Sequence, residues 1–103
     1  MRIKPTMPGY VVLSVEVLDA ERYGEYARIG PPTVAQYGGR YLVRGGQVER
    51  RSGNWEPKRL VIIEFPSVGQ AKNWWDSPEY APARALREAC AVSDVVIVEG
   101  VGT

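Results

Sequence analysis

The chain has 103 residues, of which 45% are hydrophobic and 24% charged, and its formal net charge is +1. These values are typical of one soluble globular domain and indicate no nucleic-acid, membrane or acidic partner. No apolar run approaches the roughly 20 residues of a membrane helix, and we see no signal peptide, so we expect a cytoplasmic protein. Histidine is absent and Cys90 is the only cysteine. This excludes an internal disulfide and any histidine-dependent nucleophile, zinc or haem site, and we expect neither a metal nor a cofactor.

The first half of the chain predicts two strands separated by a helix. Residues 1–8 are expected to form a flexible leader. Gly9–Val17 has one apolar and one mixed face at a period of two, which predicts a strand. Asp19–Tyr37 predicts a helix capped by its aspartate, with a kink or a break at Gly30-Pro31-Pro32 because prolines remove hydrogen-bond donors. After a glycine pair, Arg40–Arg44 predicts the second strand.

The second half predicts a central strand, two helical segments and a last strand. Lys58–Phe65 is rich in β-branched residues and apolar on both faces, so we place it in the middle of a sheet. Gln47–Arg51, before it, is a candidate arm that continues the second strand. The remaining elements are a helix Val68–Asp76 opened by a capping box of Ser67 and Gln70, a helix from Ser77-Pro78 to about Ala91, and a strand Ser93–Glu99.

The element order β-α-β-β-α-β predicts an α+β, ferredoxin-like fold for a single domain, residues 9–100, followed by a tail, residues 101–103. Its four-stranded antiparallel sheet has the first and third strands in the middle and helices on one face only. Yet Lys58–Phe65 and Ser93–Glu99 are apolar on both faces. Burying one apolar side chain is worth roughly 1.5–3 kcal/mol. The uncovered face therefore predicts a homodimer packed sheet to sheet.

Several short motifs are spread along the chain. They are Asp19, Tyr23, Tyr26, Pro31, Tyr37–Gly45, Phe65–Ser67, Ala71, Trp74-Trp75, Ser77–Tyr80, Arg87 and Glu99-Gly100. Together they resemble the bacterial domain-of-unknown-function family DUF1330, of the dimeric α+β-barrel superfamily, over roughly Tyr10 to Gly100. The resemblance implies a ferredoxin-like protomer and a dimer but no settled activity. Sibling families on this fold include cofactor-free monooxygenases, muconolactone-type isomerases, polyketide cyclases and haem-binding enzymes.

The candidate ligand pocket combines aromatic side chains with arginines. Tyr80 and Arg87 are two helical turns apart and so share one helix face. If aromatic side chains of the facing helix converge on Arg44 and Arg87, they form a pocket for a small carboxylate or enolate, because arginine binds planar anions bidentately. Glu64 is a candidate general base, although we favour an ion pair between it and Arg40. The candidate pocket residues are Tyr26, Tyr37, Arg44, Glu64, Trp75, Tyr80 and Arg87.

These residues also have a simpler interpretation, in which the rings belong to the core and the arginines pair with local carboxylates. If the pocket exists, the first hypothesis is a small-molecule protein, such as a cofactor-independent isomerase, cyclase or oxygenase acting on an enolisable or aromatic anion. The alternative is a non-catalytic ligand-sensing or assembly module. The sequence argues against RNA binding, because the third strand has no glycine and Phe65 is its only aromatic residue.

Overall fold

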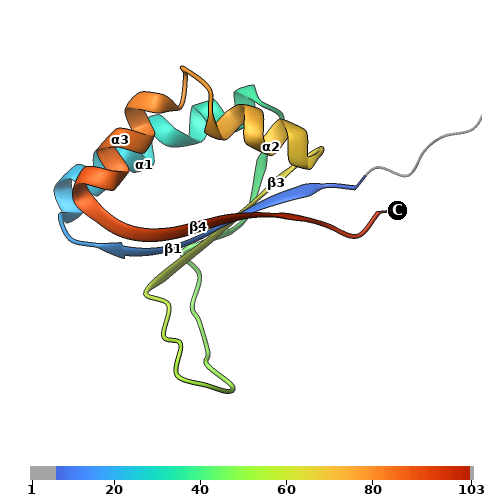
Figure 1. The fold of residues 1–103 in the computed structure, drawn as a ribbon. Helices are drawn as coiled ribbons and strands as arrows, with labels where there is room; N and C mark the ends of the chain where they lie inside the picture. The colour runs from blue at the N-terminus through green and yellow to red at the C-terminus, as the bar shows by residue number, and fades with distance from the viewer. Residues whose placement is uncertain (1–6, 103) are drawn as a thin grey trace, which may run out of the picture.

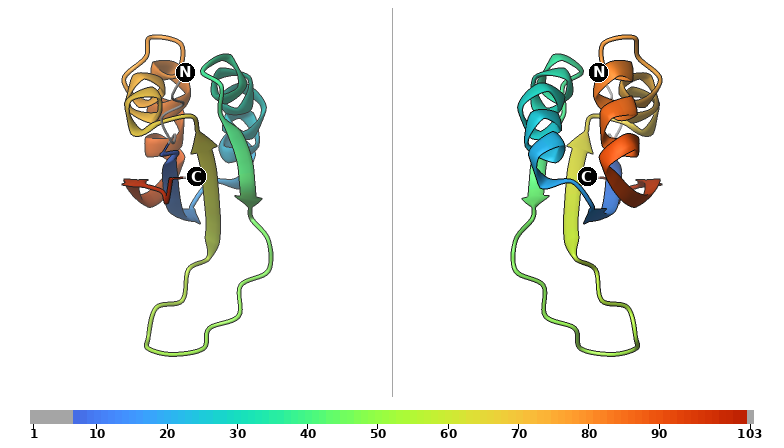
Figure 2. Two further views of the ribbon diagram at one scale, coloured as in Figure 1. Left: turned by 90° about the vertical axis from the view of Figure 1, so that its right-hand side faces the viewer. Right: turned by 90° about the vertical axis from the view of Figure 1, so that its left-hand side faces the viewer.

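Among the residues that the structure describes, one four-stranded antiparallel sheet organises the molecule, and three helices cover one of its faces (Figures 1 and 2). The computed structural model describes residues 7–102, so residues 1–6 of the predicted leader and Thr103 of the predicted tail lie outside the described residues. No helix in this range is long and apolar enough to cross a membrane. The elements are β1 (Gly9–Val17), α1 (Ala20–Gln36), β2 (Arg40–Arg44), β3 (Arg59–Phe65), α2 (Val68–Trp75), α3 (Ala81–Cys90) and β4 (Ala91–Glu99).

The strand order is β2-β3-β1-β4, so the first and third strands lie in the middle of the sheet, as the sequence predicts. Val11 of β1 pairs with Ile63 of β3 on one side and with Ile97 of β4 on the other. The alternation seen in the sequence directs every second side chain toward the helices. These side chains are fully buried in the middle of the sheet, and the fold is the predicted ferredoxin-like α+β arrangement.

The core lies between this sheet face and the helices. Trp74 of α2 is completely buried, and its ring centroid is 4.0 Å from that of Tyr80 and 5.4 Å from that of Phe65. Its Nε1 donates to Oγ1 of Thr33 in α1 at 3.0 Å, which ties the two helices together. The other large aliphatic side chains buried in this core are Val11, Leu13, Val15, Val34, Val61 and Ile63.

Helix α1 continues through Pro31 and Pro32, so of the two predicted alternatives, a kink or a break, the break does not occur. Pro31 has no N–H, and the carbonyl oxygen of Ala27, its partner in a regular helix, is therefore left free. Arg44 of β2 donates from Nη2 to this oxygen at 3.4 Å. The Thr33 hydroxyl donates to the Gly30 carbonyl at 2.6 Å. The Arg44 contact replaces part of what Pro31 removes, because it occupies the Ala27 carbonyl.

The helix starts on the second half of the chain differ in detail from those predicted. Ser67 caps α2 by accepting from the N–H of Gln70 at 3.0 Å, but the Gln70 side chain donates to the carbonyl of Tyr37 instead of completing a capping box. Helix α3 begins at Ala81, not at Pro78. The reason is that Ser77 donates to the Trp74 carbonyl and accepts from the N–H of Tyr80, which holds residues 77–80 in a turn.

The connection between β2 and β3 is a long loop that projects from the body of the molecule (Figures 1 and 2). Gln47–Arg51 was predicted as a continuation of the strand, but residues 46–58 contain no strand. The pairing of β2 with β3 already shifts register between Tyr41 and Val43. Gly45 then has a φ of +75°, which turns the chain out of the sheet direction and ends the ladder.

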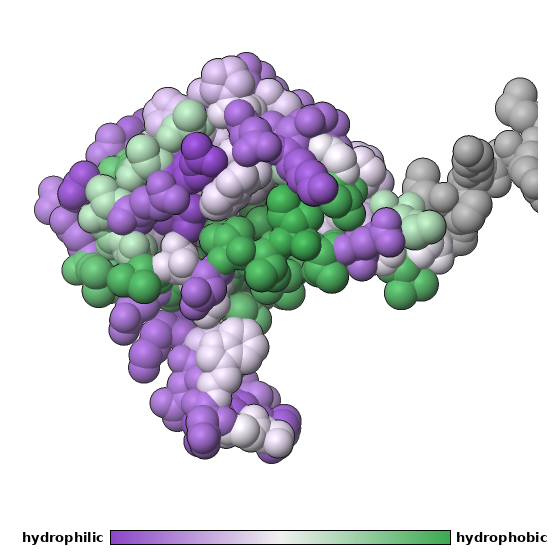
Figure 3. All heavy atoms as spheres, viewed as in Figure 1, coloured by the Kyte–Doolittle hydropathy of each residue, from purple (hydrophilic) through white to green (hydrophobic). Residues whose placement is uncertain are grey.

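The face opposite the helices is apolar in its middle. One row crosses all four strands, because Ile62 pairs with Val43 and with Val12, and Val12 pairs with Val96. None of the helices covers this row, and Val96 retains 58% of its exposure. Figure 3 shows hydrophobic side chains gathered at the level of β4, below the helical layer. We call this row the open-face row.

Candidate functional site

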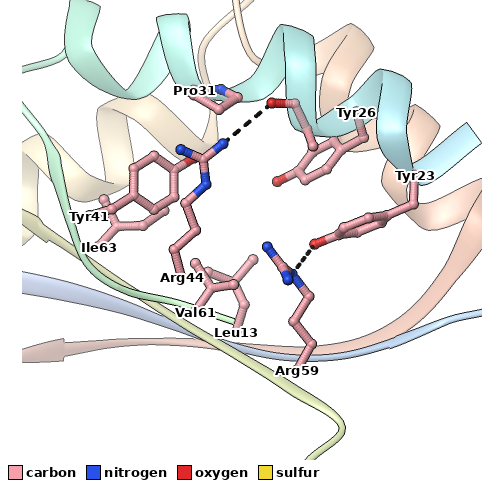
Figure 4. A pocket seen from close by; sticks show the side chains of 10 residues that line it. Leu13, Tyr23, Tyr26, Pro31, Tyr41, Arg44, Arg59, Val61 and Ile63 are labelled. Carbon is pink, nitrogen blue, oxygen red and sulfur yellow. Dashed lines mark hydrogen bonds between the residues drawn. The ribbon is translucent and has the colours of Figure 1, made fainter. Parts of the chain in front are cut away.

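A cleft lies between α1 and the helix-covered face of the sheet (Figure 4). Leu13, Val61 and Ile63 form an apolar floor. The room inside the cleft for water-sized molecules is about 20 Å³, and the cleft together with the open space at its mouth measures about 360 Å³. This room holds little more than a water molecule, so a larger ligand has to occupy the mouth. The other lining residues are Tyr23, Tyr26, Ala27, Pro31, Tyr41, Arg44 and Arg59.

Two arginines flank the mouth of the cleft. The guanidinium of Arg44 lies 4.6 Å from the Tyr41 ring centroid and reaches the free carbonyl of Ala27 at 3.4 Å. Arg59 donates from Nε to the hydroxyl of Tyr23 at 3.2 Å (Figure 4). Both acceptors are neutral, and both distances are longer than a typical hydrogen bond of this kind. An anion that accepts from these groups makes stronger, charge-assisted bonds and can displace both contacts.

The cleft is positively charged and rich in hydroxyl donors. None of its ten lining residues is acidic, and two are arginines. Burial raises the pKa of Tyr41 to about 12, and burial also raises the pKa of Tyr26 above its ordinary value. Both phenols therefore stay protonated at neutral pH. They can donate hydrogen bonds to an oxyanion, but they do not act as bases.

A pair of tyrosine hydroxyls lies behind the cleft. The hydroxyls of Tyr26 in α1 and of Tyr80, the N-cap residue of α3, are 2.9 Å apart. One of the two protons is used in this bond, so the pair keeps a second proton to donate. Tyr80 is completely buried against Trp74, which fixes the hydroxyl pair in place. Only Tyr26 lines the cleft itself.

The predicted pocket residues fall into three groups. Tyr26 and Arg44 line the cleft, and Tyr80 supports it from behind. Trp75 and Arg87 line a separate hollow between α3 and β4. The remaining two, Tyr37 and Glu64, do not line the cleft. The Tyr37 hydroxyl donates to Glu79 at 2.6 Å, and this bond to Tyr37 lowers the pKa of Glu79.

Glu64 lies on the open face of the sheet, at the end of β3. It forms the predicted ion pair with Arg40, whose Nε is 2.8 Å from Oε1. The Tyr10 hydroxyl donates to Oε2 at 3.1 Å. The bonds from Arg40 and Tyr10 both stabilise the carboxylate and hold the pKa of Glu64 below its ordinary range. This direction is opposite to that required of a general base at neutral pH.

Replacing Arg40 by methionine is expected to raise the pKa of Glu64 toward its ordinary value, because the larger of the two stabilising bonds is lost. Since the folded pKa is the lower one, ionised Glu64 stabilises the fold above its unfolded pKa. That contribution is lost as the pH falls through the lowered value. Carbon-13 NMR titration of the carboxyl group measures the pKa in both proteins. Arg51→Met, at an arginine whose side chain is 84% exposed, is the control, and equal Glu64 pKa values in all three proteins would contradict the assignment.

Three polar lining residues, Tyr23, Tyr41 and Arg59, were not among the pocket residues predicted from the sequence. Signals for two of them were present. Arg59 is two residues before Val61 and therefore on the same face of β3. Tyr23 is three residues before Tyr26 and shares its face of α1. For Tyr41 no comparable signal exists, because the register shift in β2 sets which of its side chains face the helices.

Comparison with known proteins gives a consistent picture of the fold. The model of the family "Domain of unknown function (DUF1330)" matches residues 8–101. A protein of unknown function from Rhodopseudomonas palustris is 20% identical, with a TM-score of 0.73 over 93% of this chain and 84% of that one. SnoaB, a cofactor-independent oxygenase from Streptomyces nogalater, is 15% identical, with a TM-score of 0.58 over 97% of both chains. At these identities the likeness extends to the fold alone. No curated protein matches the chain.

Proposed function

The chain belongs to the DUF1330 family, and we propose that it binds a small enolisable or aromatic anion in the cleft between α1 and the sheet. The observation that carries the proposal is the pairing of Arg44 and Arg59 at the mouth of a cleft that has no acidic lining residue. The apolar floor suits a ring or a short hydrocarbon chain. The arginine forks suit a planar carboxylate or enolate, and the Tyr26 side chain adds a neutral donor.

Such a cleft can support cofactor-independent chemistry of the isomerase, cyclase or oxygenase type. Its arginines and protonated phenols would stabilise the oxyanion that develops when a substrate enolises. The fold shared with the cofactor-independent oxygenase SnoaB supports this class by analogy. The alternative is a non-catalytic ligand-sensing module. One observation favours it, since the ten lining residues include no carboxylate or histidine to remove a proton.

We also propose that two copies of the chain associate through their open faces. The open-face row is apolar across all four strands, and a two-fold axis would place the row of one copy against that of the other. Polar groups flank the row. Arg40 and Glu64 pair at one end of the sheet, and Ser14 and Asp94 face each other at the other end. An apolar centre with a polar rim is the usual organisation of a protein interface.

Replacing Arg44 by alanine is expected to weaken binding of an aromatic carboxylate at least about tenfold, because a charge-assisted bond is worth roughly 1.5–3 kcal/mol. Isothermal titration calorimetry with a panel of benzoates and stable enols identifies a ligand and measures its affinity. The neutral amides of the same rings should bind weakly or not at all. Arg59→Ala should also lower the affinity for the aromatic carboxylate.

Arg51→Ala is the matched control, because its side chain lies on the projecting loop and is 84% exposed. It should bind as the wild-type protein does. The cleft is not the binding site if the wild type, Arg44→Ala and Arg59→Ala have equal affinities for every ligand that binds. A monooxygenase or isomerase assay with the same ligands then separates the two functional classes. Turnover supports an enzyme, and binding without turnover supports a sensing module.

A further inference from the structure

Arg87 is a buried charge without a counter-charge. Its side chain comes from the inner face of α3, and the residue is only 1% exposed. Nη1 donates to the hydroxyl of Ser93 in β4, and the guanidinium carbon lies 5.5 Å from the Trp75 ring centroid. No carboxylate among residues 7–102 forms a salt bridge with it. Nε has no hydrogen-bond partner at all, and among the described residues it is the only buried side-chain nitrogen or oxygen in this condition.

This arrangement is costly for the fold. Arginine stays protonated in proteins, so burial cannot be relieved by loss of a proton. A buried charge normally has a partner, because removing it from water costs several kcal/mol per ion. A hydroxyl and an aromatic ring give only partial compensation. An unpaired buried donor requires an explanation, and a ligand or a water molecule that accepts from Nε would provide one.

A hollow opens beside this side chain, between α3 and the edge strand β4. Its volume is about 280 Å³, and Arg87 is part of its lining. Trp75 gives it a flat aromatic wall and Val95 an apolar one, while Ser93 adds a hydroxyl. Glu88 is the only acidic group in the lining. It is exposed and forms no salt bridge with Arg87.

We propose that this hollow is a second ligand site, which takes a small carboxylate carrying a flat or branched apolar group. The carboxylate would accept from Nε and the adjacent nitrogen of Arg87, in the side-on geometry that arginine favours with planar anions. Because Nε is itself buried in the free protein, the side chains that line the hollow would have to move aside as the ligand enters. Its apolar group would pack on Trp75 and Val95. The site is distinct from the cleft, because neither Arg87 nor Trp75 is among the cleft's lining residues.

NMR titration of the full-length ¹⁵N-labelled protein with benzoate tests this proposal. The Nε–H signal of Arg87, assigned by through-bond experiments on the ¹³C,¹⁵N-labelled wild-type protein, should shift saturably with benzoate and should not respond to benzamide. The same shift is expected in Arg44→Ala, which separates this site from the cleft. Arg87→Lys keeps the charge but loses Nε, and it should weaken the binding about tenfold. Glu88→Gln removes a negative charge that repels the carboxylate of benzoate, and it should tighten benzoate binding about twofold.

The benzoate titration needs only wild-type protein, so it tests the proposal even if a variant at Arg87 fails to fold. An Nε–H signal that does not move up to the solubility limit of benzoate would overturn the proposal. So would an unchanged benzoate affinity in Arg87→Lys. A carboxylate of a second copy could supply the same chemistry. In that case the position of the Nε–H signal would depend on protein concentration, and benzoate would not displace the carboxylate of the second copy. This outcome also overturns a small-molecule site.

Discussion

Replacing Ile62 by glutamate is expected to convert a dimer of this chain into a monomer. Ile62 stands in the middle of the open-face row, paired with Val43 on one side and Val12 on the other. In a two-fold dimer each substitution acts twice. The loss of two buried isoleucines, at roughly 1.5–3 kcal/mol each, lowers the association constant by a hundredfold or more. The two carboxylates that replace them must also be desolvated, which weakens the association further.

Light scattering after size-exclusion chromatography, at micromolar concentration, measures the expected change in mass. Asn73→Glu is the matched control, because it adds the same charge to an exposed position of α2 on the opposite side of the molecule. That variant should keep the mass of the wild type. A monomeric wild-type protein, or an Ile62→Glu variant that remains a dimer, would contradict association through this face.

Replacing Trp74 by alanine is expected to cause the largest loss of stability, about 3–5 kcal/mol. The side chain is completely buried, contacts the rings of Phe65 and Tyr80, and donates to the hydroxyl of Thr33. Its removal leaves a cavity where α1, α2 and the sheet meet. A domain of this size has roughly 5–15 kcal/mol of total stability, so the variant should be close to unfolding.

Urea unfolding followed by far-ultraviolet circular dichroism measures this free energy without relying on tryptophan fluorescence. Trp55→Ala is the control, because the same residue type is removed from the projecting loop, where Trp55 is 63% exposed. Its unfolding free energy should stay within about 0.5 kcal/mol of the wild type. If the two variants lose equal stability, Trp74 does not have the central place in the core that its contacts indicate.

The packing around Trp74 also connects stability to the proposed cleft. Trp74 supports Tyr80, and the Tyr80 hydroxyl in turn holds that of Tyr26 at the cleft wall. A milder change such as Trp74→Phe should therefore affect ligand binding as well as stability. The prolines of α1 have a comparable role, because Pro31 leaves free the carbonyl that receives Arg44 at the cleft mouth.

Much of the fold could be predicted from local patterns in the sequence. The observed bounds of β1, Gly9–Val17, are those expected, and β3 begins one residue later than expected, at Arg59. The N-cap of α1 is the predicted Asp19, which accepts from the N–H of Arg22. Such features depend on side-chain alternation and on the chemistry of a few neighbouring residues. They are therefore visible in one sequence without knowledge of distant contacts.

The candidate site could be predicted only in part, because it depends on which distant side chains meet. Arg59 and Tyr23 are 36 residues apart and become neighbours only when β3 lies beneath α1. Glu64 and Arg44 come from adjacent strands, yet one lies on the open face and the other on the helix-covered face. The register shift between Tyr41 and Val43 sets the sheet face on which the Arg44 side chain lies, and no sequence pattern predicts that shift.

By itself, the sequence determined the order of the elements, the central place of β1 and β3, and a sheet that is apolar on both faces. These follow from periodicity, which is a property of consecutive residues. The tertiary structure alone decided that α1 continues through its prolines, that two arginines flank the mouth of one cleft, and that Arg87 is buried with no counter-charge among residues 7–102. The reason is physical, since each of these outcomes is set by contacts between residues far apart in the chain, and their free energies exist only once the helices have packed on the sheet.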